Sequence, residues 1–266
     1  MNTYKIWCVC LSITLLIGAS SASAAKRLKQ VKQPLVVLTF DDATVGHRTN
    51  VAPMLKKYRF GGTFYVCEFS GFEDKQKYLT WEQIGEISKM GFEIGNHSRS
   101  HGAMASQSTE TIKAETEYIE QQCSRYGIPH PATYAYPGYS NSAEGRALLQ
   151  KMGYTLARHG GDKYLQPHIS DKMLLPSFAI QDSNFSEEYI HEIMNGLQRG
   201  AIVIFCLHGV PDLAHDFVSL SPENFRKFLD IIKSYGYKVI SMRDLLKYDL
   251  YNFCNTITKI FLDRRR

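Results

Sequence analysis

The sequence predicts an α/β protein: a single deformed (β/α) barrel of about seven parallel strands, with its site at the C-terminal ends of the strands. Apolar, β-branched segments alternate with capped helical segments along the chain, and this alternation is typical of a parallel sheet. The length suits one large domain. Polar residues suited to catalysis follow several predicted strands, as they do in barrels. The strand count favours a barrel over an open, doubly wound sheet.

The elements follow from hydrophobic periodicity and from capping residues. Strands are predicted at residues 35–40, 63–66, 92–95, 133–136, 154–157, 174–180, 201–207 and 238–241. Helices are predicted at residues 50–58, 80–90, 108–125, 141–152, 186–197, 221–235 and 242–248. Thr80 and Gln83 form a capping box, and Asn141 and Glu144 are predicted to form another. Pro222 suits the first position of a helix.

The two ends of the chain are predicted to lie outside the catalytic domain. Residues 1–24 are typical of a signal peptide, with Lys5 before an apolar core and an Ala-Ser-Ala cleavage site at its end. An uncleaved membrane anchor is the alternative. Residues 25–33 are a short linker, 34–250 the catalytic domain and 251–266 a basic tail. We therefore expect a periplasmic or extracellular protein with no stable membrane insertion after cleavage.

Charge and cysteine content exclude several classes of protein. The formal net charge is +5, and no basic stripe interleaved with aromatic residues is present, which argues against nucleic-acid binding. The four cysteines beyond the predicted signal peptide show no C-x-x-C spacing, so neither a structural zinc site nor a thioredoxin-type motif is indicated. Disulfide pairing and oligomeric state stay open. Cys67 and Cys206 lie in apolar segments and are predicted to be buried.

Acidic residues and histidines at strand ends suit a metal-dependent hydrolase. Asp41 and Asp42 follow one strand, His97 and His101 follow another, and His208 follows the most apolar strand of the chain. One carboxylate and two histidines make a three-ligand site for a divalent metal, with a position left for water. The second carboxylate suits a general base, and the last histidine a general acid. Zinc fits these ligands best, and cobalt or nickel are alternatives.

Alone, each of these pieces has a simpler explanation. The aspartates suit a helix cap, and a histidine after an apolar strand is often a core residue. An H-x-x-x-H pair is weak evidence in a chain with nine histidines, and Ser98 replaces the glutamate of the zinc-protease motif. The pair suits one helical turn, but Gly95 and Asn96 favour a turn from strand to loop. The placement of all the pieces at strand ends carries the prediction.

The same residues resemble a known family in their order along the chain. The sequence is similar to the polysaccharide deacetylases, that is, carbohydrate esterase family 4 or the NodB-like (chitooligosaccharide deacetylase) homology domain, over roughly residues 34–248. The motifs that carry the resemblance are Thr39-Phe40-Asp41-Asp42, His97-Ser98-x-x-His101, Tyr136-Pro137 and Leu207-His208-Gly209. The resemblance implies a deformed (β/α) barrel and hydrolytic removal of N-acetyl or O-acetyl groups from a carbohydrate polymer or oligosaccharide.

The resemblance also implies a role for each matching residue. Asp41 corresponds to the catalytic base and His208 to the general acid. The ligands of one divalent metal correspond to Asp42, His97 and His101. Leu207 corresponds to a residue that lines the acetyl pocket. Tyr136, Pro137 and Tyr139 lie in the predicted site loop and are candidate substrate-binding residues, because the two tyrosine rings could stack on sugar rings.

Three positions depart from the family pattern. Ala43 replaces the usual glycine after the two aspartates, and Ala135 stands where the third motif often carries an arginine that orients the base. Arg158, after the next predicted strand, is the candidate replacement. The fourth motif, which supplies a carboxylate partner for the acidic histidine, is not recognisable, and Asp162 is the candidate for that part.

Two other classes of function stay open at this point. One is a hydrolase of the same fold that cleaves a C–N bond in a small non-sugar amide, against which predicted export argues. The other is a carbohydrate-binding protein with weakened catalysis, which the missing arginine favours. The sequence does not identify the polysaccharide. His47 and His215 lie in loops after two of the motifs and are expected to be exposed to solvent.

Overall fold

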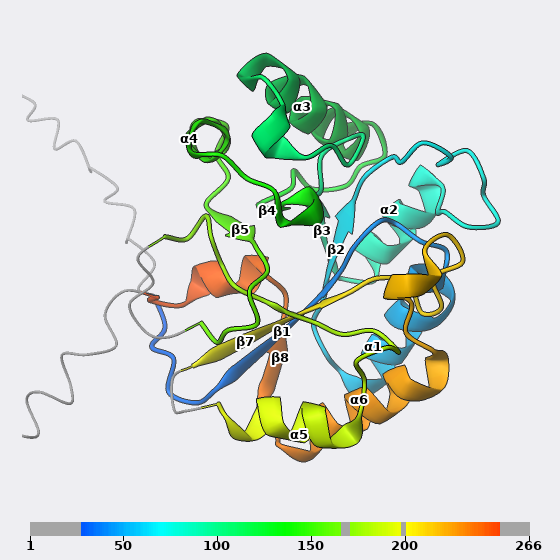
Figure 1. Ribbon diagram of the computed structural model, residues 1–266, viewed down its shortest axis with the longest axis vertical. Helices are drawn as coiled ribbons and strands as arrows, with labels where there is room; N and C mark the ends of the chain where they lie inside the picture. Colours follow the sequence, from blue (N-terminus) through cyan, green and yellow to red (C-terminus); the bar gives the residue numbers. More distant parts are fainter. Residues whose placement is uncertain (1–27, 166–170, 198–200, 251–266) are drawn as a thin grey trace, which may run out of the picture.

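An eight-stranded parallel sheet forms the centre of the computed structural model (Figure 1). The structure describes residues 28–165, 171–197 and 201–250. The predicted signal peptide (1–24), residues 25–27 of the linker and the predicted tail (251–266) lie outside the described residues. The strand order is β5-β4-β3-β2-β1-β7-β6, and β8 pairs with β1. No helix in the described part of the chain has the length and apolar character needed to cross a membrane.

The elements alternate along the chain as predicted. The strands are β1 (Leu35–Phe40), β2 (Thr63–Val66), β3 (Glu93–Asn96), β4 (Thr133–Ala135), β5 (Leu156–Arg158), β6 (Phe178–Ala179), β7 (Ile202–Leu207) and β8 (Lys238–Ile240). The α-helices are α1 (Ala52–Tyr58), α2 (Trp81–Lys89), α3 (Thr109–Arg125), α4 (Ala143–Lys151), α5 (Glu187–Asn195) and α6 (Pro222–Ser234). The short turns are the π-helical η1 (His47–Val51) and the 3₁₀-helical η2 (Met104–Ser106), η3 (Pro137–Tyr139), η4 (Asp216–Val218) and η5 (Arg243–Lys247).

The sheet curls into a deformed barrel. β1 pairs along its full length with β7, while its first half pairs with β8 and its last two residues pair with β2. On the opposite side, Leu175 forms a parallel bridge to Arg158 of β5, and three residues later Phe178 of β6 pairs with Phe205 of β7. The segment from Leu175 to Ala179 thus joins β5 to β7 and closes the sheet, which confirms the predicted deformed (β/α) barrel.

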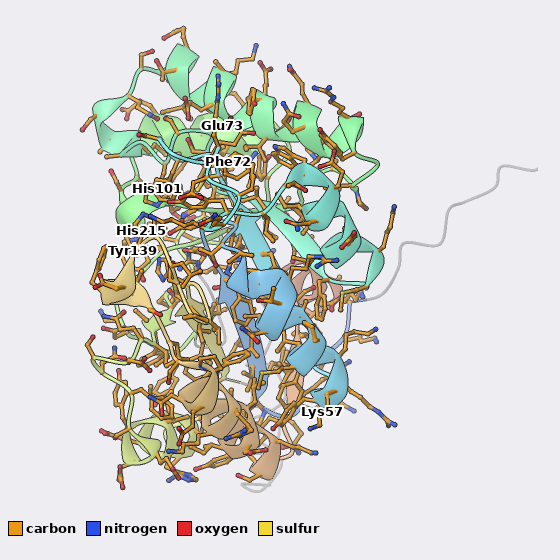
Figure 2. All side chains as sticks on the ribbon, turned by 90° about the vertical axis from the view of Figure 1, so that its right-hand side faces the viewer. Lys57, Phe72, Glu73, His101, Tyr139 and His215 are labelled. Carbon is orange, nitrogen blue, oxygen red and sulfur yellow. The ribbon has the colours of Figure 1, made fainter. Side chains whose placement is uncertain are left out.

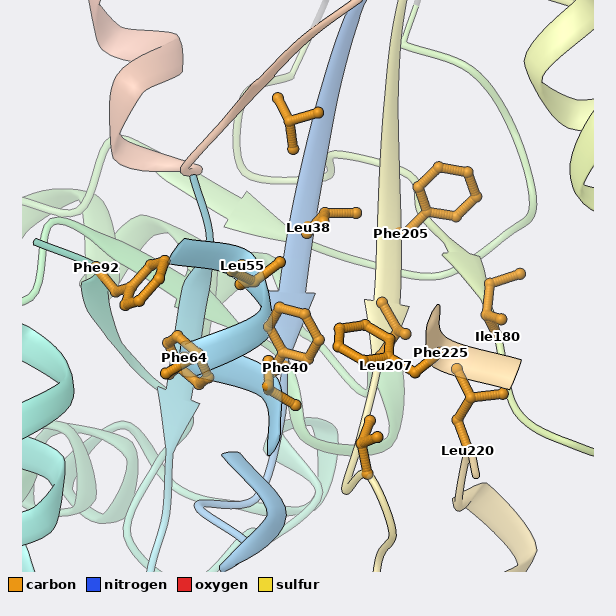
Figure 3. Packing of buried hydrophobic residues seen from close by; sticks show 14 of the residues in the cluster. Leu38, Phe40, Leu55, Phe64, Phe92, Ile180, Phe205, Leu207, Leu220 and Phe225 are labelled. Atoms are coloured by element: carbon orange, nitrogen blue, oxygen red, sulfur yellow. The ribbon is translucent and has the colours of Figure 1, made fainter. Parts of the chain in front are cut away.

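Strand alternation separates an inner apolar layer from an outer one. Leu35 and Val37 of β1 share the inner cluster with Ile202 and Ile204 of β7. The intervening residues of both strands belong to a larger cluster beneath the helices. Figure 3 shows part of this outer cluster, including Leu38, Phe40, Phe205 and Leu207. Continued past the strand ends, the inner series reaches Asp41 and His208.

Most helix starts follow the predicted caps. Thr80 accepts a hydrogen bond from the Gln83 amide in a complete capping box. Ser108, Ser186 and Ser221, the first residues of three predicted helices, also act as N-caps. The predicted cap at Asn141 is wrong, because Ser142 accepts the Gly145 amide and caps α4 instead.

Three predicted elements are shorter or different in the structure. The segment predicted as a strand at 174–180 has only two residues of strand, because part of it bridges to β5 before β6 begins. The helix predicted at 50–58 begins as the π-helical turn η1, and the helix predicted at 242–248 is the 3₁₀ turn η5. The described cysteines (Cys67, Cys123 and Cys206) are buried with free thiols, as predicted for Cys67 and Cys206.

Candidate metal centre and active site

A cavity of about 340 Å³ opens at the C-terminal ends of the strands. Its floor contains the predicted acidic and histidine residues from the ends of β1, β3 and β7. Its lining residues are Asp41, Asp42, Phe69, His97, His101, Tyr136, Gly138, Tyr139, Ala179, Gln181, Cys206, His208, His215, Phe217 and Val218. In Figure 2, His101, Tyr139 and His215 lie together at one edge of the molecule, far from Lys57. The position agrees with the barrel rule that active sites form where the strands end.

A left-handed turn brings both aspartates into this cavity. Successive side chains of a strand point to opposite faces, so Asp41 and Asp42 would diverge if β1 simply continued. Instead Asp42 and Ala43 have φ values of 77° and 49°. Both carboxylates therefore line the cavity, and both residues are only 3% exposed. The positive φ at Ala43 explains why glycine suits this position in the family pattern.

The two histidines predicted to bind metal lie on a braced loop and not on a helix. His97 continues the inward series of β3, and the chain then turns through Ser98 and His101, both with positive φ. Glu115 of α3 fastens the loop, because one of its oxygens accepts hydrogen bonds from the Ser98 hydroxyl (2.9 Å), the Ser100 amide (2.6 Å) and the Ser100 hydroxyl (2.9 Å). A tight loop, and not a helical turn, therefore brings His97 and His101 together.

Asp42, His97 and His101 fit a divalent cation. Asp42 Oδ1 lies 3.5 Å from His97 Nε2 and 3.7 Å from His101 Nε2, and one donor atom of each residue lies within 4.8 Å of the others. His97 Nδ1 donates to the Ala135 carbonyl at 2.8 Å, which leaves the Nε2 lone pair directed at the carboxylates. A carboxylate and two imidazoles are a common donor set for zinc and similar metals.

The electrostatics of the site also favour a cation. Burial lowers the pKa of His97 to about 4, and burial together with His97 lowers that of His101 to about 3, so both rings are neutral at neutral pH, as metal ligands must be. Burial and the neighbouring Asp41 charge raise the pKa of Asp42 well above its usual range. A bound cation would compensate this buried negative charge.

Arg158 supplies the guanidinium that is missing from the third motif. It is fully buried at the end of β5 and forms an ion pair with Asp41. Its guanidinium lies 5.5 Å from the ring centroid of Tyr65 and 5.7 Å from that of Tyr139. Burial alone would raise the pKa of Asp41, but the charges of Arg158 and His97 outweigh it and lower that pKa to about 2. Asp41 is therefore ionised at neutral pH.

His208 lies beside the aspartates, and hydrogen bonds to the backbone of its loop hold it there. Its Nε2 lies 3.8 Å from Asp42 Oδ2, and burial lowers its pKa. His47 of η1 contacts the His208 carbonyl through Nε2 at 3.1 Å, and Asn50 donates to the Val210 carbonyl at 2.8 Å. The expectation that His47 is exposed is wrong: it is fully buried because η1 packs against the loop after β7.

The predicted substrate-binding residues divide into two groups. Tyr136 and Tyr139 line the cavity, whereas Pro137, although buried in the same loop, is not part of its lining. Leu207 faces the outer cluster beneath the helices, so the prediction that it lines a pocket needs correction. Cys206, on the inner face of β7, lines the cavity in its place.

Asp162 does not take the part expected of it. Asp162 is exposed and does not line the cavity. Its backbone amide donates a hydrogen bond to the Ser177 carbonyl at 3.1 Å. Asp212, which sequence reasoning missed, is the buried carboxylate of the loop after β7. It accepts amide hydrogen bonds from Ala214 (2.9 Å) and His215 (2.8 Å), and its charge acts on His208. The signal available in the sequence was that Asp212 lies four residues after His208.

Sequence reasoning also missed an aromatic wall of the cavity. Phe69 follows β2, and His215 and Phe217 lie in the loop after β7; all three line the cavity. His215 is half-buried against Phe69 and not free in solvent, which corrects the second histidine expectation. The signal for Phe69 was its position after a predicted strand, but aromatic residues in such loops are common.

The fold and the arrangement of these side chains define a class: a hydrolase of the deformed (β/α) barrel type with a candidate carboxylate–histidine–histidine metal site. The profile of the family described as polysaccharide deacetylase matches residues 28–157. This match confirms the resemblance to that family found in the motifs of the chain.

Individual relatives are distant. The chain is 23% identical over 224 residues to a peptidoglycan-N-acetylglucosamine deacetylase from Bacillus cereus, covering 81% of this chain and 90% of that protein. A family 4 acetyl xylan esterase from Clostridium thermocellum, solved with a cobalt ion, is 23% identical with a TM-score of 0.57, covering 82% and 94%. A CE4 family pseudoenzyme from Bacillus anthracis is 17% identical with a TM-score of 0.56, covering 82% and 66%. These structural likenesses concern the fold.

Proposed function

We propose that this protein is an exported, metal-dependent deacetylase that hydrolyses N-acetyl groups on a carbohydrate polymer or oligosaccharide. One observation carries the proposal: a single cavity contains the Asp42–His97–His101 donor set, an ionised aspartate paired with a buried arginine, and a histidine at the end of the neighbouring strand β7. These are the parts that hydrolysis of an amide requires.

Each side chain has a part in this chemistry. Asp42, His97 and His101 would hold a divalent cation, with zinc as first choice, and that cation would supply Lewis acidity towards the attacking water and the acetyl carbonyl. Asp41 accepts the proton of the attacking water. Arg158 keeps Asp41 ionised and orients its carboxylate. His208 donates a proton to the departing amine nitrogen of the sugar.

The walls of the cavity suit an acetylated sugar. Tyr139 is half-buried in the lining and presents aromatic surface to the cavity, whereas Tyr136 is fully buried and its hydroxyl donates a hydrogen bond to the Met173 carbonyl at 2.9 Å. The apolar faces of sugar rings stack on such surfaces. The names of the relatives point to peptidoglycan amino sugars and to acetylated xylan, so both N- and O-acetyl groups belong in the test.

Acetate release from a panel of substrates tests the proposal. The panel contains acetylated chito-oligosaccharides, peptidoglycan, acetyl xylan and a small non-sugar amide, each with chelator and after metal is added back. We expect chelator-sensitive release from an N-acetylated glycan, restored by zinc or cobalt. Acetate release from the small amide alone would indicate the alternative function, a hydrolase of the same fold that cleaves a C–N bond in a small non-sugar amide. Oligosaccharide binding without any release would indicate a binding protein that has lost catalysis.

Export is a separate part of the proposal. It rests on the signal-like features of residues 1–24, with cleavage after Ala24. N-terminal sequencing of the extracytoplasmic protein should begin at Ala25. Recovery of the full-length chain from the cytosol would contradict this part and leave the enzymatic part unaffected.

A further inference from the structure

Two adjacent strands bring a second set of donor atoms into the cavity. β1 and β7 pair in parallel along their full length, so Asp41 and His208, the residues that follow them, lie side by side. Cys206 lies on the inner face of β7, and its thiol donates to Asp41 Oδ2 at 3.6 Å. One donor atom each from Asp41, Cys206 and His208 lies within 4.8 Å of the others. This second set shares no residue with the set proposed above to hold a divalent cation.

One oxygen of Asp41 is available to a ligand. Asp41 Oδ2 accepts the hydrogen bonds of the Arg158 guanidinium and the Cys206 thiol. Asp41 Oδ1 is buried and has no hydrogen-bond partner in the described part of the chain. Asp41 lines the cavity, so this oxygen belongs to a side chain that a small ligand in the cavity can reach. A buried carboxylate oxygen without a partner is costly, and a bound cation is one of the groups that would satisfy it.

The charges around this second set select for a cation that bonds to sulfur. The guanidinium of Arg158 already balances the Asp41 carboxylate, so a hard cation such as Mg²⁺ would meet no net negative charge within the set. A metal that displaces the proton of the Cys206 thiol gains a thiolate ligand and one negative charge, and the proton leaves to solvent. Thiolate and imidazole ligands suit zinc and softer metals, whereas Mg²⁺ prefers oxygen ligands.

A buried cysteine is more often a small hydrophobic residue than a ligand, and the chain offers a comparison. The Cys67 thiol donates to Asp42 Oδ1 at 3.6 Å, so it is also buried beside an aspartate of the site. Cys67 nevertheless does not line the cavity, and it belongs to neither of the two donor groups found in the described residues. Cys206 differs from it in both respects, and its contact with the aspartate is therefore more than packing.

We infer that Asp41, Cys206 and His208 form a second, inhibitory site for zinc or a softer divalent cation such as cadmium. Binding at this site does not depend on the proposed function, but the inhibition rests on it. The proposed base and the proposed acid would both become ligands of the second cation, and neither could then transfer a proton. The protein would be active with one cation per chain and inactive with two.

Cadmium titration of the full chain, first freed of metal with a chelator, tests the binding directly, because a cadmium–thiolate bond gives an ultraviolet charge-transfer band. We would compare the wild type with Cys206→Ser, Cys206→Ala and the matched control Cys67→Ser by this absorbance and by elemental analysis. The wild type and Cys67→Ser should bind two cadmium ions per chain and show the band. Both Cys206 variants should bind one fewer and lose the band, and Mg²⁺ should produce no second bound ion in any of the proteins.

Zinc inhibition of acetate release tests the consequence. The activity of each protein is expressed relative to its own value at one zinc per chain. Excess zinc should inhibit the wild type, and the concentration for half inhibition should rise by at least about 100-fold in Cys206→Ala, because even the outer partners of metal ligands commonly contribute about 10–100-fold in affinity.

Three results would decide against parts of this inference. An unchanged cadmium stoichiometry and band in both Cys206 variants, or an equal loss in Cys67→Ser, would overturn the second site. Equal zinc inhibition of the wild type and Cys206→Ala would reject its inhibitory role. Failure of the proposed function looks different: the wild type would release no acetate at any zinc concentration, while the cadmium results would still support the second site.

Discussion

The ion pair between Asp41 and Arg158 is the main electrostatic contact between the ends of β1 and β5. Both side chains are almost completely removed from solvent. A buried pair is weak evidence for stability in itself, but loss of one partner leaves an unpaired charge in a medium that solvates it poorly. The same contact keeps the proposed base ionised, so it links the stability of the fold with its chemistry.

Arg158→Met should therefore destabilise the metal-free protein by about 3–5 kcal/mol at neutral pH. The pKa of Asp41 in the folded protein is about 2, below its ordinary value of 3.8. The stabilisation is therefore present above about pH 4 and is lost as the pH falls towards 2. Urea unfolding of both proteins between pH 3 and 7 measures the difference, which should shrink at low pH. A constant difference across this range would contradict the role given to the pair.

Asp41 and His208 should be required for turnover but not for metal binding. Asp41→Asn keeps the size of the side chain and removes the base, and His208→Ala removes the acid. Each change should lower turnover by about 10²–10⁴-fold while one metal per chain is retained. His208→Ala should affect an O-acetyl ester less than an N-acetyl amide, because an alkoxide leaves more readily than an amine anion. Near wild-type turnover of Asp41→Asn with metal bound would reject this mechanism.

Two loops carry the site, and each is fastened by a side chain from another element. The loop after β3 holds the proposed metal ligands His97 and His101 and is braced by Glu115 of α3. The loop after β7 holds the proposed acid and is braced by His47 and Asn50 of η1. Gly46, just before η1, approaches this loop so closely that an added Cβ would lie 2.7 Å from the Pro211 carbonyl oxygen. Metal affinity and proton transfer should therefore respond to different mutations.

Glu115→Ala should weaken metal binding by about 10–100-fold, because outer partners of a metal loop commonly contribute that much. The reason is that Ser98 and Ser100 lose their common acceptor and the loop with His101 becomes less ordered. Competition with a chromophoric chelator measures the affinity. Glu117→Ala, on the same helix but paired only with Lys113 at the surface at 3.5 Å, is the control and should bind metal normally. Equal affinity in both variants would show that the brace is dispensable.

His47→Leu should lower turnover on an amide substrate without changing metal stoichiometry, because the His208 carbonyl loses its donor. Burial lowers the pKa of His47 to about 4, so the ring is neutral and its Nε2–H can donate to this carbonyl at neutral pH. His47→Gln retains an N–H group in a similar position and should recover part of the rate. If the glutamine and leucine variants behave alike, packing and not hydrogen bonding explains the effect.

Across the whole molecule, metal binding, protonation and folding should be coupled. His97 and His101, with pKa values of about 4 and 3, have no proton to lose at pH 7, whereas Asp42 has a raised pKa. Metal uptake should thus release protons over the pH range in which Asp42 is protonated, and below about pH 4 the histidines should add to the release. Calorimetry in buffers of different ionisation enthalpy counts these protons. Proton release that does not increase as the pH falls below about 4 would contradict His97 and His101 as ligands.

The local sequence determined the order of strands and helices, most helix caps and the residues at the strand ends. Periodicity and capping are local properties, and a barrel brings all strand ends to one face whatever their separation along the chain. The convergence of Asp41, Asp42, His97 and His208 could therefore be predicted. The family resemblance added the roles, which await the experiments above.

Only the tertiary structure decided which side of each strand faces the cavity and which distant residues meet there. β7 is apolar on both faces, so its pattern does not tell whether Cys206 or Leu207 points inward. The inward turn of Asp42 depends on a positive φ that its residue type does not require. Arg158 reaches Asp41 from 117 positions away in the chain, and His47 is buried by a loop that comes far later. Such contacts depend on how the barrel closes, which no local pattern specifies.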